Sequence, residues 1–183
     1  MTEMTEHMDK FSPVHRKFIL HWGEMGTRWG VNRTVAQVHA LLFLAGEPMN
    51  AERIASTLEV ARSNVSTSLR ELQGWGIVRM VHVMGDRRAH FESLQDVWEM
   101  FRTILRERKR REVEPTLAVL RECVASLDKG GADARTRRRL EALLDFFETM
   151  SGCSEEVIQL PPETLRTFIK LRGKVRALLG RLR

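Results

Sequence analysis

The feature that most restricts the fold of this chain is a pair of short amphipathic helices followed directly by strand-like sequence. We expect the first helix over residues 50–58 and the second over about 62–74, because apolar residues recur in both every three or four positions. β-branched residues then dominate 77–83, which predicts a strand. The few residues between the two helices allow only a tight turn, so few small folds fit this order of elements.

The predicted strand is expected to return as one half of a β-hairpin. Gly85-Asp86 is a turn signal, and 89–92 has the composition of a second strand. A helix-turn-helix followed by a hairpin is the winged variant of that motif, whose second helix lies in the major groove of DNA. The predicted fold class is therefore mainly α with a small β-hairpin: a winged helix-turn-helix plus a helical dimerisation region.

Further amphipathic helices flank this module on both sides. Asn32 is a good N-cap for a helix over about 33–45. After the hairpin, Ser93 with Asp96 resembles a capping box that opens a long helix, and Pro115 predicts a kink or a break further along. The first helix of the chain has one apolar face formed by Val14, Phe18, Trp22, Met25 and Trp29.

These elements divide the chain into three parts. Residues 1–31 hold the N-terminal helix, which we assign to the dimerisation region; 32–94 form the winged helix-turn-helix DNA-binding domain; and 95–183 form a C-terminal helical dimerisation region. The helices after Asp96 have apolar stripes without a partner in the small DNA-binding module, so we expect them to pack on each other and on a second subunit. A purely intramolecular cap is the alternative. A dimer would place two recognition helices about one turn of DNA apart.

The predicted helix at about 62–74 has a polar face suited to the major groove. Opposite its apolar stripe of Val65, Leu69 and Leu72 lie short hydroxyl side chains, which let the backbone approach a groove. Arg and Asn side chains form the bidentate pairs that distinguish guanine and adenine, and the N–H groups at a helix N-terminus can hold a phosphate. The candidate DNA-binding residues of this helix are Arg62, Ser63, Asn64, Ser66, Thr67 and Arg70.

Arginines also mark the predicted hairpin. Arg87 and Arg88 follow the turn at its tip, where a guanidinium can contact the DNA backbone or enter a narrow minor groove, and Arg79 can reach a phosphate from the first strand. A solvated surface is the competing interpretation, because 61–95 contains five arginines against three acids and so has a net charge of only 5 − 3 = +2. The polar helix followed by an arginine-tipped hairpin favours double-stranded DNA as the partner.

The charge of the whole chain permits a polyanionic partner without establishing one. Its formal net charge is +6. The basic run at 106–111 is interrupted and followed by glutamates, which is typical of a solvated helix face. Much of the excess charge belongs to the final predicted helix, whose basic residues are Arg166, Lys170, Arg172, Lys174, Arg176, Arg181 and Arg183.

A series of short motifs extends through residues 35–92: Ala40-Leu41-Leu42-Phe43-Leu44, Glu47-Pro48-Met49, Ile54-Ala55, Arg62-Ser63-Asn64-Val65-Ser66, Leu69-Arg70-Glu71-Leu72, Trp75-Gly76-Ile77-Val78 and Gly85-Asp86-Arg87-Arg88. Together with the aromatic, glycine-bearing segment 22–30, they resemble the GbsR branch of the MarR-like transcriptional regulators. The resemblance implies a homodimer on a two-fold-symmetric operator, with terminal helices forming the dimer interface. It departs at Ala61, where related sequences often place a Ser or Thr cap before the recognition helix.

These observations predict a sequence-specific regulator of transcription, a repressor, that binds a pseudo-palindromic operator in double-stranded DNA as a homodimer. The alternative is a winged-helix protein-interaction module without DNA binding, in which the face from Arg62 to Arg70 would be dispensable. Phosphate loops, nucleophile elbows and paired carboxylates are missing from the sequence, so no enzymatic activity is expected. The polar, acidic N-terminus and the lack of a long apolar run predict a cytoplasmic protein that does not enter a membrane.

Smaller features suggest further, weaker hypotheses. Trp22, Trp29 and Trp98 would, with neighbouring methionines, suit a pocket for a small apolar or quaternary-ammonium effector, although aromatic residues at helical spacing are more often core. The histidines show no metal-ligand spacing, so neither a metal nor a cofactor is expected. Cys123 and Cys153 lack a partner doublet and fit a reducing compartment, with a redox sensor as the alternative.

Overall fold

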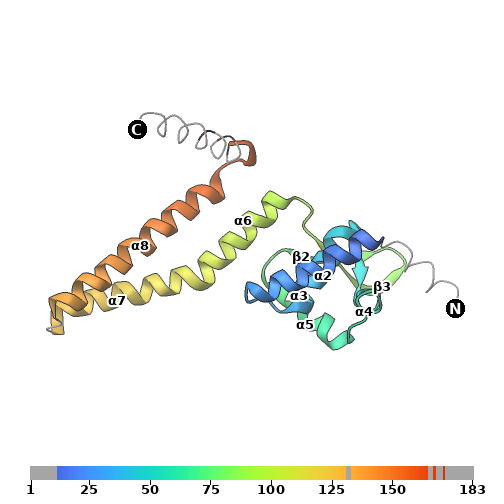
Figure 1. The fold of residues 1–183 in the computed structure, drawn as a ribbon, viewed down its shortest axis with the longest axis horizontal. Helices are drawn as coiled ribbons and strands as arrows, with labels where there is room; N and C mark the ends of the chain where they lie inside the picture. The colour runs from blue at the N-terminus through green and yellow to red at the C-terminus, as the bar shows by residue number, and fades with distance from the viewer. Residues whose placement is uncertain (1–11, 131–132, 165–166, 168–170, 172–183) are drawn as a thin grey trace. The chain divides into compact units, whose positions relative to one another are not determined.

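The fold is mainly helical with one small antiparallel sheet, which confirms the predicted fold class. A computed structural model of the chain describes residues 12–130, 133–164, 167 and 171 (Figure 1). The chain divides into two compact units, one extending to Thr103 and the other beginning at Ile104. The elements in chain order are α2 (Pro13–Arg28), α3 (Arg33–Ala45), β1 (Met49–Asn50), α4 (Ala51–Leu58), α5 (Arg62–Gly74), β2 (Val78–Val83), β3 (Asp86–Ser93), α6 (Val97–Arg108), the π-helix η2 (Lys109–Val113), α7 (Glu114–Gly130) and α8 (Ala134–Gln159).

Helix α3 forms the centre of the first unit. Its residues from Val35 to Leu42 are all buried, and α2, α4, α5 and β3 pack around it. The helix begins where predicted, since Asn32 Oδ1 accepts a hydrogen bond from the Thr34 N–H at 2.8 Å. It ends at Gly46, whose left-handed φ of 62° suits a residue without a Cβ. A helix buried on all sides positions its neighbours, so α3 fixes the geometry of the helix-turn-helix around it.

Helix α2 packs against α3 through a face that the apolar spacing did not predict. Its buried residues are Ile19, Gly23 and Gly26, whereas Val14 and Trp29 of the predicted stripe are 75% and 67% exposed. The two glycines let the helices approach closely: a Cβ on Gly26 would lie 2.6 Å from the Ala36 Cβ. The predicted stripe is therefore not the buried face of α2, and several of its apolar side chains point into solvent.

Helices α4 and α5 and the hairpin follow the predicted order. Asn50 caps α4 by accepting a hydrogen bond from the Arg53 N–H at 2.9 Å, as expected. The strands lie in the order β1-β3-β2, with Met49 of β1 opposite Phe91 of β3. Strand β1 was not predicted, because two residues carry no periodic pattern and form a strand only through their pairing with β3. Gly85 turns the hairpin with a φ of 84°.

The start of α6 differs from the prediction. Ser93 is the buried last residue of β3, and its hydroxyl donates to the Leu94 carbonyl at 3.2 Å, so the predicted capping box is wrong. Asp96 is the cap instead: its Oδ1 accepts from the N–H groups of Trp98 and Glu99 at 2.7 and 2.9 Å. The β-sheet pairing of Ser93 therefore outcompetes its helix-capping tendency.

In the second unit, α8 turns back along α7, and the π-helix η2 precedes α7 (Figure 1). Pro115 neither breaks nor ends the helix, because the wider π turn directly before it accommodates the missing N–H. Leu117, Leu120 and Ile158 are buried here, and Arg121 pairs with Glu148 of α8 at 2.8 Å. The basic residues of the final predicted helix lie outside the described residues. In the part of the chain that is described, no helix is both long and apolar enough to span a membrane.

Candidate nucleic-acid interface

Helix α5 separates its residues as the sequence predicted. Val65, Leu69 and Leu72 are buried together with Ser68, and the opposite side is open to solvent. A side chain that faces solvent can meet a DNA groove without unfolding any part of the protein. The six exposed candidates on this helix are Arg62, Ser63, Asn64, Ser66, Thr67 and Arg70.

The N-terminus of α5 has no side-chain cap. Ala61 occupies the cap position in an extended conformation, and no acidic residue lies in the first turn. The first N–H groups of a helix have no partner within the helix, and the helix dipole makes that end partly positive. An anion, such as a phosphate, is therefore favoured at this end of α5.

Two candidate arginines from different elements meet at one carboxylate. Arg62 Nη2 of α5 lies 2.9 Å from Glu52 Oε1, and Arg88 Nη1 of β3 lies 3.9 Å from Glu52 Oε2. Glu52 belongs to the first turn of α4. The structure thus brings the start of α5 and the hairpin together at a residue that the sequence analysis did not select.

The tip of the hairpin is ordered by a second carboxylate. Asp86 accepts from the Arg88 backbone N–H at 2.9 Å and from two nitrogens of its guanidinium, Nε at 2.9 Å and Nη2 at 2.5 Å. These hydrogen bonds hold the pKa of Asp86 well below its usual range. His90 contributes nearby, with its Nδ1 2.9 Å from the Arg88 carbonyl. Arg88 is therefore held against its own strand rather than projecting freely from the tip.

The remaining candidate arginines fall into two groups. Arg79 is 73% exposed but pairs across the hairpin with Glu92, Nε to Oε1, at 2.6 Å. Arg70 has only a long contact of 3.4 Å with the Thr67 hydroxyl. Among the residues that the structure describes, Arg70 and Arg87 form no ion pair with a carboxylate. These two exposed cations are the ones immediately available to a polyanion.

Sequence reasoning missed the two acids, Glu52 and Asp86, for different reasons. Asp86 lies two residues before Arg88 in a turn, a spacing at which aspartate often bonds to the local backbone, so its pairing was detectable. Glu52 approaches Arg62 and Arg88 only through the tertiary fold. No local signal in the sequence could have placed it there.

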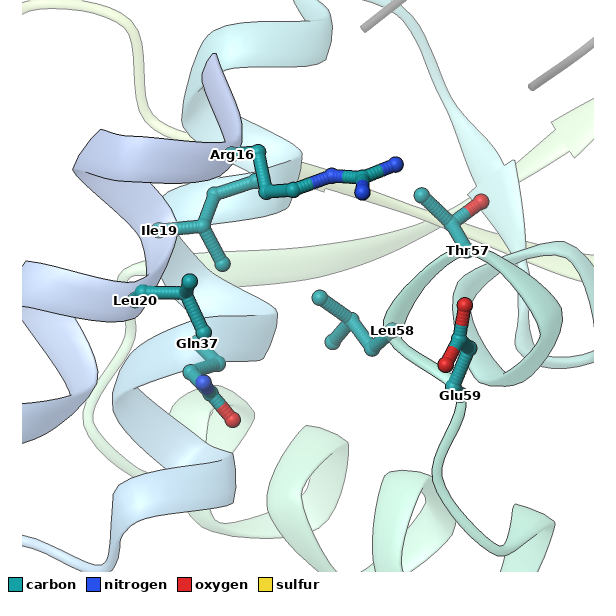
Figure 2. A pocket seen from close by; sticks show the side chains of 7 residues that line it. All are labelled: Arg16, Ile19, Leu20, Gln37, Thr57, Leu58 and Glu59. Atoms are coloured by element: carbon teal, nitrogen blue, oxygen red, sulfur yellow. The ribbon is translucent and has the colours of Figure 1, made fainter. Parts of the chain in front are cut away.

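The three tryptophans expected to line an effector pocket have different surroundings. Trp22 stacks on Phe18 with ring centroids 5.3 Å apart, and Trp98 meets Phe101 edge-on at 6.4 Å. Trp29 is largely exposed at the end of α2. A separate hollow of about 190 Å³ lies between α2, α3 and the end of α4 (Figure 2). Its lining contains no tryptophan and consists of Arg16, Ile19, Leu20, Gln37, Thr57, Leu58 and Glu59.

Comparisons with known proteins agree with this geometry. Residues 29–89, from the end of α2 into β3, match the model of the MarR family. This part of the chain is similar to the MarR family and has the winged helix-turn-helix fold. The HTH-type transcriptional repressor GbsR of Bacillus subtilis (strain 168) is 23% identical over 101 residues, which make up 55% of this chain and 56% of that repressor. The match therefore spans little more than half the length of this relative, and the chain is GbsR-like over that part.

A solved structure shows the same fold over a longer range. A crystal structure described as that of a transcriptional regulator superposes with a TM-score of 0.68 and 22% identity. It covers 80% of this chain and 96% of the other one. The part of the chain that superposes is longer than residues 29–89. The shared fold therefore also includes helical residues outside the winged helix.

Proposed function

We propose that this chain is a sequence-specific, double-stranded-DNA-binding regulator of transcription, a repressor, that acts as a homodimer. The observation that carries the proposal is the exposed polar face of α5, whose N-terminus is uncapped and lies beside an arginine-bearing hairpin. The naming of the Bacillus subtilis relative as a repressor supports the direction of regulation. Such a regulator acts where the chromosome is, so the proposal places it in the cytoplasm and gives it no enzymatic step.

In this proposal, α5 enters the major groove and the hairpin contacts the backbone or the minor groove. Arg70 reads a base edge, because it lies on the exposed face of α5 and pairs with no acid among the described residues. Base edges and the nearest phosphates are contacted by the shorter polar side chains of this face: Ser63, Asn64, Ser66 and Thr67. Arg87 binds phosphate without reading sequence, and Arg79 and Arg88 do so after exchanging their carboxylates for phosphates.

Homodimerisation is supported by apolar side chains that the described residues leave uncovered. On α2 and its C-cap these include Val14 and Trp29, and on α8 they include Phe146 and Met150, each at least half exposed. On α8, Leu143, Phe146 and Met150 recur at helical spacing and form one exposed apolar stripe, and contiguous exposed apolar surface commonly marks a protein interface. We therefore assign residues 1–31 and 95–183 to the dimerisation region and 32–94 to DNA binding, with a pseudo-palindromic operator that matches the two-fold symmetry.

The decisive experiment begins by selecting bound sequences from random duplex DNA and then measures affinity by gel shift. Arg70→Ala is expected to weaken binding to the selected sequence by about 1–3 kcal/mol, roughly tenfold to a hundredfold, and to change binding to mixed-sequence DNA little. Arg87→Ala is expected to weaken binding to both duplexes and to reduce the salt slope by about one. Arg139→Ala, which removes an exposed cation of α8, is the control for net charge.

Two results would contradict the proposal. Unchanged affinity in the Arg62, Arg70, Arg87 triple alanine variant would show that α5 is not the reading element and would favour the protein-interaction alternative. Light scattering at micromolar concentration should give twice the chain mass of 21.2 kDa, and a monomer mass would refute the homodimer.

A further inference from the structure

The cluster around Glu52 balances its own charge in the free protein. Arg62 and Arg88 contribute two positive charges, and Glu52 and Asp86 contribute two negative ones, so the four side chains sum to zero. All of the pairs are at least partly exposed; the Glu52 side chain itself is 43% exposed. At the proposed DNA face, the cluster therefore adds little long-range attraction, which is left to cations such as Arg70 and Arg87.

We infer that Glu52 is an internal competitor for DNA phosphate. In the free protein its carboxylate holds the Arg62 guanidinium across the start of α5 and lies within 3.9 Å of Arg88 on the hairpin. A phosphate that binds at the uncapped N-terminus of α5 lies next to Arg62, the first residue of the helix, and competes with Glu52 for its guanidinium. DNA must therefore displace Glu52, and this inference rests on the proposed function.

The two acids of the cluster have different roles. Asp86 is two residues from Arg88 and binds its backbone N–H as well as its guanidinium, so it shapes the hairpin tip. Glu52 belongs to a different element, has no hydrogen bond to the hairpin backbone among the described residues, and contacts Arg88 only at the limit of an ion pair. Because exposed ion pairs are weak, a phosphate that arrives in the right register can replace Glu52 at low cost.

This competition would change the ratio of specific to non-specific affinity for DNA. A duplex that binds without docking α5 in its groove gains no affinity from Arg62, because Arg62 stays paired with Glu52. A duplex that docks α5 fully places a phosphate where it can take the guanidinium over. Glu52 thus lowers non-specific affinity more than specific affinity, and the ratio of the two determines how a regulator finds its site among many competing sequences.

Glu52 would have the opposite role if it helped DNA binding, and its removal would then change the affinity for DNA in the opposite direction. If Glu52 preorganised Arg62 and Arg88 for DNA, removing its charge would loosen both side chains and weaken binding. If Glu52 competes with phosphate, removing its charge frees both arginines and strengthens binding. The sign of one affinity change therefore separates the two roles.

The test uses the full chain and a fluorescein-labelled duplex of mixed sequence, roughly two helical turns long, with binding followed by anisotropy between about 50 and 200 mM KCl. Glu52→Gln is expected to tighten binding roughly three- to tenfold and to steepen the salt slope by about one, since at least one more guanidinium releases counterions from DNA. Glu24→Gln, which makes the same charge change at an exposed residue of α2, is the matched control and should stay within about twofold. Thermal melting by circular dichroism verifies that both variants fold.

A second variant identifies the arginine involved. In the Arg62→Ala background, Glu52→Gln should lose most of its gain, because the 2.9 Å pair is the tighter of the two contacts. If the wild-type chain binds the duplex and Glu52→Gln binds equally or more weakly than Glu24→Gln, the competitor role is overturned while the DNA-binding proposal stands. If no form binds any duplex at low salt, the DNA-binding proposal and the inference that depends on it are both wrong.

Discussion

Replacement of Gly26 by alanine tests whether the close approach of α2 to α3 is essential to the first unit. The new Cβ would lie 2.6 Å from the Ala36 Cβ, whereas carbon atoms in contact are normally about 3.5–4.0 Å apart, so α2 would have to retreat by about 1 Å. Overpacking of this kind costs about 1–3 kcal/mol, and the better helix propensity of alanine returns about 1 kcal/mol. We expect the free energy of unfolding to fall by up to about 2 kcal/mol.

The assay is urea unfolding followed by circular dichroism, which reports on the helices of both units. Gly152→Ala in α8 is the control, because a Cβ there meets nothing within 4 Å, and it should stabilise its helix by about 0.5–1 kcal/mol. Ala36→Gly combined with Gly26→Ala removes the clash, so the two substitutions should show a coupling energy of about 1–2 kcal/mol. Additive effects, or a Gly26→Ala chain stabilised as much as the Gly152→Ala chain, would refute the packing argument.

Three further predictions concern stability. Burial lowers the pKa of His39 from 6.5 to about 4, so its imidazole is neutral in the folded chain above that pH. Its contribution to the free energy of unfolding is therefore complete above pH 6.5, the pKa of histidine in the unfolded chain. As the pH falls from about 6.5 toward 4, this residue should cost up to about 3 kcal/mol of the free energy of unfolding, and urea titrations of a His39→Leu variant should show a weaker pH dependence. Asn50→Ala should destabilise the first unit by about 1 kcal/mol in the same assay, because it removes the cap of α4. Ala61→Ser should stabilise it by about 0.5–1 kcal/mol by adding a cap to α5, and no gain in urea resistance would contradict this.

Local chemistry was enough to predict the helix-turn-helix. Asn32 and Asn50 begin helices because their side chains bond to backbone N–H groups a few residues away, and that geometry depends on no distant residue. The buried stripe of α5 also follows directly from its spacing. The exposed side of α5 could therefore be identified before the fold was known.

What the sequence could not reveal depends on contacts between distant residues. The buried face of α2 is defined by Gly23 and Gly26, and glycines carry no hydrophobic signal although they permit the closest helix packing. Strand β1 exists only because β3 pairs with it. The charge state of the proposed DNA face depends on Glu52, which is ten residues from Arg62 in the chain and more than thirty from Arg88.

The π turn and Pro115 together restrict how the length of this helix can vary. A π turn holds one residue more than an α turn, so deleting one residue from Lys109–Val113 would restore regular helix geometry before α7. Pro115 would then lie inside a regular α-helix, where its ring clashes with the carbonyl group four residues earlier, at a cost of about 3 kcal/mol. Among related chains, loss of a residue at this point should therefore coincide with loss of the proline.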